Sequence, residues 1–166
     1  MATTALGGTP CETCGPLPEV GSAAPSYELL TSDMTDVGPQ PGTATVLNVF
    51  PSVDTSVCAA SVRRFNELAA GLDGARVVCV SHDLPFALRR FCGAEGVDDV
   101  VVATAFRSSF GEDYGLRLVD GAFAQLLARA VVVVDGEGVV RHVQLVDDIS
   151  SEPDYDAALA ALAAAG

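Results

Sequence analysis

The stretch Thr45–Leu72 reads TVLNVFPSVDTSVCAASVRRFNELAAGL, and it predicts the centre of the fold. Thr45 to Phe50 form an apolar run rich in β-branched residues, which stops at Pro51 as a buried strand would. Beyond Pro51, apolar residues recur at the spacing of a helix as far as Leu72. We therefore expect a buried strand that leads directly into a helix.

The junction between this strand and this helix carries a candidate nucleophile. Asp54, Thr55 and Ser56 offer side-chain oxygens that can cap a helix, and Cys58 falls in or near its first turn. Unpaired backbone N–H groups and the positive end of the helix dipole favour a thiolate at such a position. We therefore predict that Cys58 is a reactive thiol. The competing interpretation is a small buried apolar residue, because free cysteine is among the most buried residue types.

Composition and charge narrow the class of protein. At 166 residues the chain is long enough for one domain and too short for two ordinary ones. Its net charge of −13, with nine Arg and no Lys, argues against binding to nucleic acid or to an anionic membrane. No stretch resembles a membrane span, and the N-terminus shows neither a basic leader nor an apolar signal core. We expect a cytoplasmic protein.

Five cysteines form an odd set: Cys11, Cys14, Cys58, Cys79 and Cys92. A static disulfide framework is not expected in such a chain, so the thiols are better candidates for redox chemistry or metal binding. A zinc site needs about four ligands, and the sequence offers no second close pair of Cys or His beside Cys11 and Cys14. We therefore expect no metal. Cys79 lies within an apolar strand and is expected to be inert.

Around the central strand and helix, the remaining pattern predicts a mixed sheet. Expected strands cover residues 27–30, 76–81, 100–104 and a hairpin of 128–135 with 139–146, and expected helices cover 85–91, 108–114 and 153–165. Residues 34–42, rich in Pro and Gly, are expected to form a loop. This order fits an α/β protein with a thioredoxin-like fold, in which a central mixed β-sheet is flanked by helices. Residues 1–20 are expected to form an N-terminal arm or hairpin, and residues 21–166 the thioredoxin-like domain.

Several residues outside the helix start suit the chemistry of an activated thiol. Cys92 is expected where the 85–91 helix ends, and a sulfenic acid on Cys58 can condense with it if the two Cα atoms come within about 7 Å. Arg129 begins a buried strand, where a guanidinium is costly unless something anionic lies beside it. It is either a fixed positive charge next to the thiol or part of a structural ion pair. The Thr55 hydroxyl can bind the sulfur or a bound oxygen, and Pro51 can shield the sulfur from water.

At this point the sequence resembles a known family. PSVDTSVC (residues 51–58) resembles the P-x-x-x-T-x-x-C motif of the peroxiredoxins. The longer strings LNVFPSVDTSVCAASVRRFN, SHDLPFALRRFCGAEG, ARAVVVVD and QLVDDISSEPDY are similar to the bacterial thiol peroxidases, an atypical two-cysteine subfamily.

This resemblance implies a function and a set of site residues. Cys58 would be the peroxidatic cysteine and Cys92 the resolving one in the same subunit, with Thr55 and Arg129 as polar partners of Cys58 and Pro51 as its shield. The resemblance further implies a thioredoxin-like fold, a homodimer, thioredoxin as reductant, and hydrogen peroxide or alkyl hydroperoxides as substrates. No metal or organic cofactor is implied.

The chain departs from the family near its N-terminus, where GTPCETCGP adds a Cys-x-x-Cys. One alternative is therefore a dithiol-disulfide oxidoreductase that works through Cys11 and Cys14. The other alternative is a peroxide sensor without enzymatic turnover, in which a disulfide between Cys58 and Cys92 switches the binding of a partner. Ordinary placement of Cys11 and Cys14 in a hairpin is the simplest interpretation of the pair.

Overall fold

The structure is a computed structural model, and it describes residues 1–165 of the chain. The strands are β1 (Thr3–Leu6), β2 (Thr9–Glu12), β3 (Leu29–Thr31), β4 (Asp36–Val37), β5 (Ala44–Val49), β6 (Ala75–Ser81), β7 (Val101–Thr104), β8 (Ala130–Val134) and β9 (Val140–Leu145), and the helices are α1 (Ser56–Ala69), α2 (Pro85–Glu95), α3 (Phe110–Asp113) and α4 (Tyr155–Ala165).

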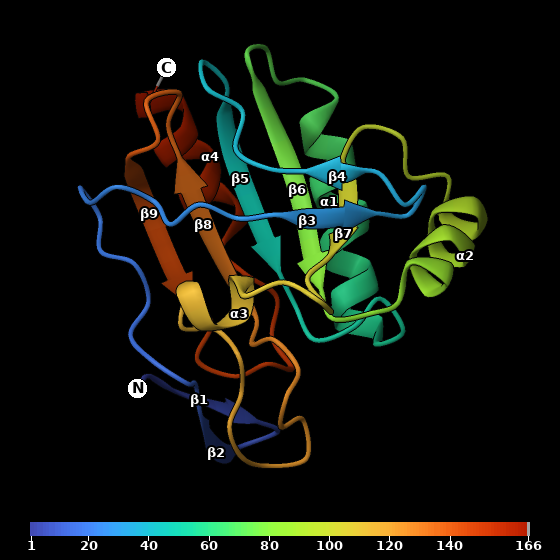
Figure 1. Ribbon diagram of the computed structural model, residues 1–166, viewed down its shortest axis with the longest axis vertical. Helices are drawn as coiled ribbons and strands as arrows, with labels where there is room; N and C mark the ends of the chain where they lie inside the picture. Colours follow the sequence, from blue (N-terminus) through green and yellow to red (C-terminus); the bar gives the residue numbers. More distant parts are fainter. Residues whose placement is uncertain (166) are drawn as a thin grey trace.

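Seven of the strands form one mixed sheet in the order β4-β3-β7-β6-β5-β8-β9 (Figure 1). β5, β6 and β7 are parallel, whereas β8 runs antiparallel to β5, and β3 runs antiparallel to β7. The helices that join parallel strands, α1 and α2, must each cross over a face of the sheet, and both pack with α4 into the cluster on one face. The predicted thioredoxin-like fold, a mixed sheet flanked by helices, is confirmed.

The predicted strand and helix at the centre are β5 and α1. Along β5, Val46 faces one apolar cluster, whereas Leu47 and Val49 face the other. This alternation follows from the period of two in a strand. On the α1 side of the sheet, Val62 and Phe65 are fully buried. The junction that carries Cys58 is therefore anchored on both sides by core residues.

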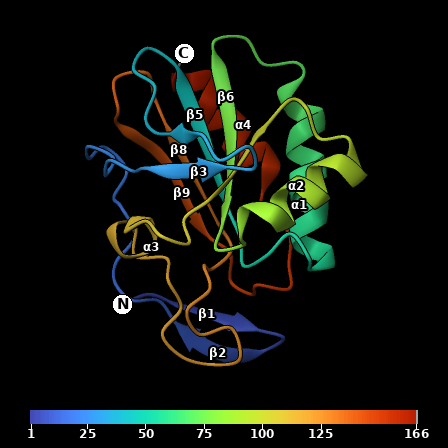
Figure 2. The same ribbon diagram turned by 45° about the vertical axis from the view of Figure 1, so that its right-hand side comes forward.

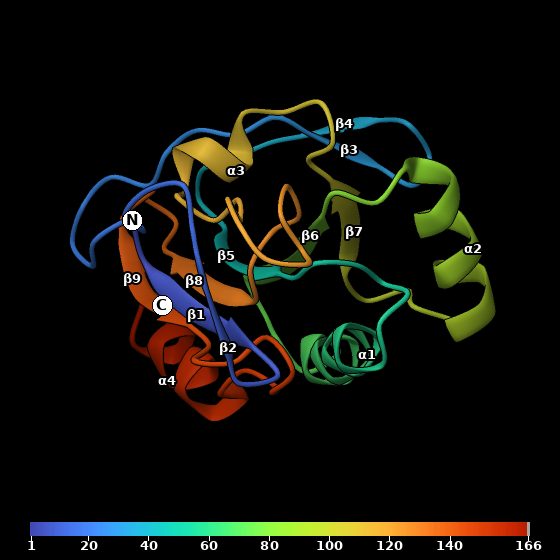
Figure 3. The same cartoon turned by 90° about the horizontal axis from the view of Figure 1, so that it is seen from below.

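Helices cover the two faces of the sheet unequally. Figure 3 shows α1 and α4 side by side on one face, where Phe65 and Tyr155 pack edge to face with ring centroids 5.1 Å apart. The other face is covered by α3 and by the segment that precedes β3, with Phe110 and Tyr114 buried against the sheet. The thicker α1 and α4 layer contains the buried Cys58.

Two local expectations were wrong. The expected end of α2 at Cys92 and Gly93 is not observed, because the helix continues to Glu95 and ends where Gly96 adopts φ 63°, a conformation that glycine reaches without strain. Cys92 therefore lies within the last turn. The expected loop of residues 34–42 contains the short strand β4, which pairs with β3 before the Pro- and Gly-rich part begins.

The N-terminal residues form a separate two-stranded sheet, β1 and β2, joined at Gly7 and Gly8. Both glycines have positive φ, 58° and 87°, which a tight hairpin turn requires. Figures 1 and 2 show this hairpin below the end of the main sheet at which β5 leads toward α1. The expected hairpin is confirmed, and the domain boundary after residue 20 stays a prediction. Within residues 1–165, no helix is both long and apolar enough to cross a membrane.

Candidate active site

Cys58 lies in the first turn of α1 and is fully buried. Thr55 is the N-cap residue, with extended backbone, and its Oγ1 accepts a hydrogen bond from the Cys58 backbone N–H at 3.3 Å. Of the three candidate capping residues in the sequence, Thr55 is thus the one that caps α1. The thiol is held close to the positive end of the helix.

Arg129 brings a guanidinium directly to this thiol. Its Nη2 donates to the Cys58 Sγ at 3.0 Å, and its Nε donates to the Ile149 backbone oxygen at 2.7 Å. The side chain is 1% exposed, and its Nη1 has no hydrogen-bond partner among residues 1–165. No carboxylate in that range forms a salt bridge with it. A buried, uncompensated guanidinium favours an anion beside it, which makes the positive-charge interpretation of Arg129 the better one.

Two further polar residues hold the backbone at Cys58, and sequence reasoning missed both. Ser61 Oγ donates to the Cys58 backbone oxygen at 2.8 Å, and Asn48 Nδ2 donates to Ser61 Oγ at 3.3 Å. Both side chains are fully buried. The signal that could have found them is Asn48 itself, because a polar residue in the middle of an apolar strand needs a partner.

The loop between β5 and α1 is held by a carboxylate from elsewhere. Pro51 is buried two residues beyond the end of β5. Beyond it, Ser52 Oγ donates to Asp83 Oδ1 at 2.7 Å, and the Val53 backbone N–H donates to Asp83 Oδ2 at 2.9 Å. Asp83 lies directly before Leu84, which is the N-cap residue of α2 and makes no side-chain capping bond. Asp83 fixes the loop that carries the candidate site.

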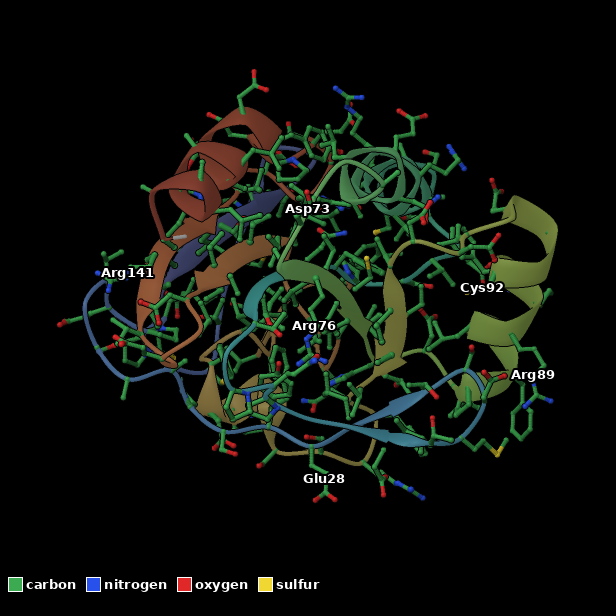
Figure 4. The ribbon with its side chains drawn as sticks, turned by 90° about the horizontal axis from the view of Figure 1, so that it is seen from above. Glu28, Asp73, Arg76, Arg89, Cys92 and Arg141 are labelled. Atoms are coloured by element: carbon green, nitrogen blue, oxygen red, sulfur yellow. The ribbon has the colours of Figure 1, made fainter. Side chains whose placement is uncertain are left out.

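Cys92 lies in the last turn of α2, at the edge of the molecule where Figure 4 labels it. It is half-buried and opens onto a groove of about 520 Å³ that Arg89 and Asp98 also line. Burial raises the pKa of the Cys92 thiol, and the nearby Asp33 and Asp98 carboxylates raise it further. In this structure Cys58 and Cys92 both carry free thiols and lie on different helices.

The remaining cysteines have different surroundings. Cys11 on β2 is buried among apolar side chains that include Leu118 and Ile149, and burial raises its pKa, followed by the charges of Asp120 and Asp148. Cys14 lies beyond β2, and its Sγ donates to the Gly111 backbone oxygen at 3.5 Å. The two thiols of the Cys-x-x-Cys therefore contact different parts of the molecule. Burial and the two carboxylates disfavour a thiolate at Cys11.

Comparisons with known proteins identify the family of this chain. A family model described as Redoxin matches residues 19–159. Thiol peroxidases from Mycobacterium bovis and Mycobacterium tuberculosis are each 54% identical over 166 residues, which covers 99% of this chain and 100% of theirs. A thiol peroxidase from Corynebacterium glutamicum is 53% identical over 164 residues, which covers 98% of this chain and 99% of its own.

Solved structures give the same result for the fold. A peroxiredoxin-like protein from Aquifex aeolicus has a TM-score of 0.96 at 38% identity and covers 100% of this chain and 98% of its own. A thiol peroxidase from Chromobacterium violaceum has a TM-score of 0.86 at 19% identity, covering 98% of this chain and 95% of its own, a likeness of fold alone. Identity of 54% over the full chain, together with the Redoxin match, shows that this chain belongs to the thiol peroxidases of the Redoxin family.

Proposed function

We propose that this thiol peroxidase reduces hydrogen peroxide and alkyl hydroperoxides through Cys58. The observation that carries the proposal is the 3.0 Å hydrogen bond from Arg129 Nη2 to the buried Cys58 Sγ at the start of α1. A fixed positive charge and a helix N-terminus at one sulfur are the two features that most favour a nucleophilic thiolate.

In the first step, the Cys58 thiolate attacks one oxygen of the hydroperoxide and the O–O bond breaks. The other oxygen leaves as water or an alcohol after it takes up a proton, and Cys58 becomes a sulfenic acid. The sulfur is oxidised by two electrons and the peroxide is reduced by two. Arg129 Nη1, buried and without a partner among residues 1–165, is positioned to donate to the peroxide oxygens as negative charge develops on them.

Thr55 and Pro51 complete this part of the site in the proposal. The Thr55 hydroxyl caps α1 and also donates weakly to the Ser52 backbone oxygen at 3.4 Å, so it can turn toward a bound peroxide at small cost. Pro51 is buried at the end of β5, where it would keep bulk water from the sulfur.

In the second step, the Cys92 sulfur attacks the sulfenic sulfur, and water leaves as an intrasubunit Cys58–Cys92 disulfide forms. Cys58 and Cys92 belong to α1 and α2, and both lie inside a helical turn. We expect local unwinding of both turns before the sulfurs meet, because a disulfide needs Cα atoms within about 7 Å. A dithiol such as thioredoxin would then reduce the disulfide and be oxidised itself.

We also propose an oligomeric state and a cellular compartment. Leu84, Phe86 and Phe106 are large apolar residues that stay exposed, and they come from segments that follow the neighbouring strands β6 and β7. Such a patch supports the proposal of a homodimer.

A cycle that depends on free thiols needs a compartment that keeps them reduced, which supports the cytoplasm. The proposed chemistry uses no metal or organic cofactor.

Single and double variants test the proposal. Cys58→Ser is expected to abolish the consumption of hydrogen peroxide in the presence of a thioredoxin system, because the nucleophile is lost. Cys11→Ser/Cys14→Ser is expected to keep at least about half of the activity of the parent chain, because neither thiol forms a hydrogen bond with Cys58 or Arg129 within residues 1–165. Loss of turnover in the double variant with retention in Cys58→Ser would favour the dithiol oxidoreductase. One oxidation per chain without recycling would favour the sensor.

A further inference from the structure

The N-terminal hairpin is attached to two segments of the chain. Glu12 on β2 bonds to Val119 and Asp120, and β1 together with the turn bonds to residues 146–150, which follow β9. The Thr4 hydroxyl donates to the Val146 backbone oxygen at 2.7 Å, and the Ile149 backbone N–H donates to the Ala5 backbone oxygen at 2.7 Å. Thr4 is 3% exposed, and Ile149 is 2% exposed. These are buried, directional bonds, so the hairpin and residues 146–150 form one unit.

The Asp148 carboxylate binds the turn of the hairpin at Gly7 and Gly8. Its Oδ1 accepts from the Gly7 N–H at 3.0 Å, and its Oδ2 accepts from the Gly8 N–H at 2.7 Å. Two consecutive N–H groups can converge on one carboxylate because Gly7 and Gly8 both have positive φ. Hydrogen bonds from Ser150, and then those from Gly8 and Gly7, hold the pKa of Asp148 well below its usual range. The carboxylate is therefore ionised throughout the physiological range.

The same segment contacts the site from its other side. The Ile149 backbone oxygen accepts from Arg129 Nε at 2.7 Å, and Arg129 Nη2 donates to the Cys58 Sγ at 3.0 Å. The Ile149 backbone is thus held by Ala5 through its N–H and holds Arg129 through its carbonyl oxygen. A guanidinium is planar, so its position at Nε also fixes the direction of Nη1 and Nη2.

We propose that the N-terminal hairpin is a positioning element for Arg129, and that Asp148 is the positioning residue through which the hairpin acts. In this arrangement, the Asp148 carboxylate fixes the hairpin turn to residues 146–150, and Ile149 then sets the guanidinium at the thiol. This inference rests on the proposed function of Cys58. It assigns to the hairpin a role in the reaction, although none of its residues is within hydrogen-bond distance of the sulfur among the bonds described for residues 1–165.

A double-mutant cycle tests this proposal. The variants are Asp148→Ala, Arg129→Ala and the two combined, all in a Cys92→Ser chain so that only the first oxidation of Cys58 is followed. The matched control is Asp147→Ala, which removes the same charge from the adjacent residue, whose side chain has no hydrogen bond or salt bridge within residues 1–165. The measured quantity is the second-order rate constant for sulfenic acid formation with hydrogen peroxide, obtained by trapping the product and quantifying it by mass spectrometry.

The expected result is a loss that depends on Arg129. Asp148→Ala should lower the rate constant about three- to tenfold when Arg129 is present and by less than about 1.5-fold when it is replaced, because residues that act through one another are not additive. Asp147→Ala should stay within about 1.5-fold of the parent chain. If Asp148→Ala does not fold, Thr4→Val serves in the same cycle, since it removes one anchor of the hairpin and keeps the shape of the side chain.

Three results would overturn the inference or its basis. Equal losses from Asp148→Ala in the presence and absence of Arg129 would show that the residue acts independently of the guanidinium. A loss no larger than that of Asp147→Ala would show that the hairpin contact does not matter for the reaction. If the parent chain itself reacted with peroxide no faster than Cys58→Ser, the proposed function would fail, and with it the premise of this inference.

Discussion

The three thiols nearest the central sheet differ in their surroundings rather than in residue type. Cys58 and Cys79 are both fully buried, yet only Cys58 has a guanidinium at 3.0 Å. Burial raises the pKa of Cys79 to about 12, which the 3.6 Å hydrogen bond from Asn48 only partly offsets. Cys92 is half-buried, and its pKa is raised first by burial and then by the charges of two nearby carboxylates, Asp33 and Asp98. At neutral pH we expect reactivity in the order Cys58, Cys92, Cys79.

The Cys92 thiol gives a pH prediction. Replacing Asp33 and Asp98 together by Asn removes two negative charges that raise the Cys92 pKa, so the pKa falls and more thiolate is present at a given pH. Alkylation of Cys92 at pH 8 should become about twofold faster, since burial, the larger cause, is unchanged. Peptide mass spectrometry measures the rate for this cysteine alone. Asp73→Asn, in the turn between α1 and β6, is the control, and equal rates in all three chains would contradict the prediction.

At the scale of elements, the loop between β5 and α1 is clamped to the segment that carries Cys92. Asp83, just before α2, binds the loop through Ser52 and the Val53 backbone N–H. Arg90, on α2, forms a salt bridge to Asp54 at 2.6 Å, with both side chains more than half exposed. The partly buried contact of Asp83 should matter more, because exposed ion pairs contribute little. In the proposed cycle, this clamp would hold the loop during the reaction with peroxide and would open before Cys58 and Cys92 meet.

Asp83→Ala should therefore affect the two steps in opposite directions. Sulfenic acid formation at Cys58 should slow about three- to tenfold, because the loop loses both anchoring bonds, whereas the later disulfide with Cys92 should form faster. Overoxidation of Cys58 to sulfinic acid should fall accordingly. Rapid quenching and mass spectrometry resolve all three species.

Asp54→Ala is the matched variant for this prediction. It removes only the exposed salt bridge to Arg90, so each rate should change by less than about twofold. More sulfinic acid in Asp83→Ala than in the parent chain would contradict the idea that this carboxylate restrains the loop.

The sequence predicted the local chemistry at the start of α1 better than the contacts between distant segments. Thr55 and Cys58 could be placed because an N-cap and a first turn depend on a few neighbouring residues. The continuation of α2 past Cys92 was missed, because a glycine inside a helix reads like a stop although only Gly96 adopts the left-handed conformation. The partners of Asp83 were missed because they lie some thirty positions earlier in the chain.

At the scale of the whole molecule, a mixed thioredoxin-like sheet could be anticipated but the attachment of the hairpin could not. The alternation of strands and helices restricts the topology to few arrangements, and the thioredoxin-like one is observed. Arg129 was singled out because a charge in an apolar strand needs a partner. The backbone oxygen of Ile149 that holds it carries no signal in the sequence, because every residue has such a group.

The exposed apolar patch gives a prediction about assembly. Phe86 is 64% exposed at the start of α2 and lies in the patch with Leu84 and Phe106 that supports the proposed homodimer. Phe86→Glu should weaken self-association at least about tenfold, because a charge would have to be desolvated in the interface. Sedimentation velocity over a range of concentrations measures this. Val20→Glu, at a similarly exposed residue before β3, should leave the association constant unchanged, and a parent chain that is monomeric at every concentration would contradict the proposed dimer.

The central claim is that Cys58 and Cys92 carry out one peroxidase cycle within one chain. Mapping every disulfide by mass spectrometry, before and after one equivalent of hydrogen peroxide, tests it most directly. The account predicts five free thiols before oxidation and a single intrachain Cys58–Cys92 disulfide after it, with Cys11, Cys14 and Cys79 still free. A disulfide between Cys11 and Cys14, with Cys58 unmodified, would contradict it.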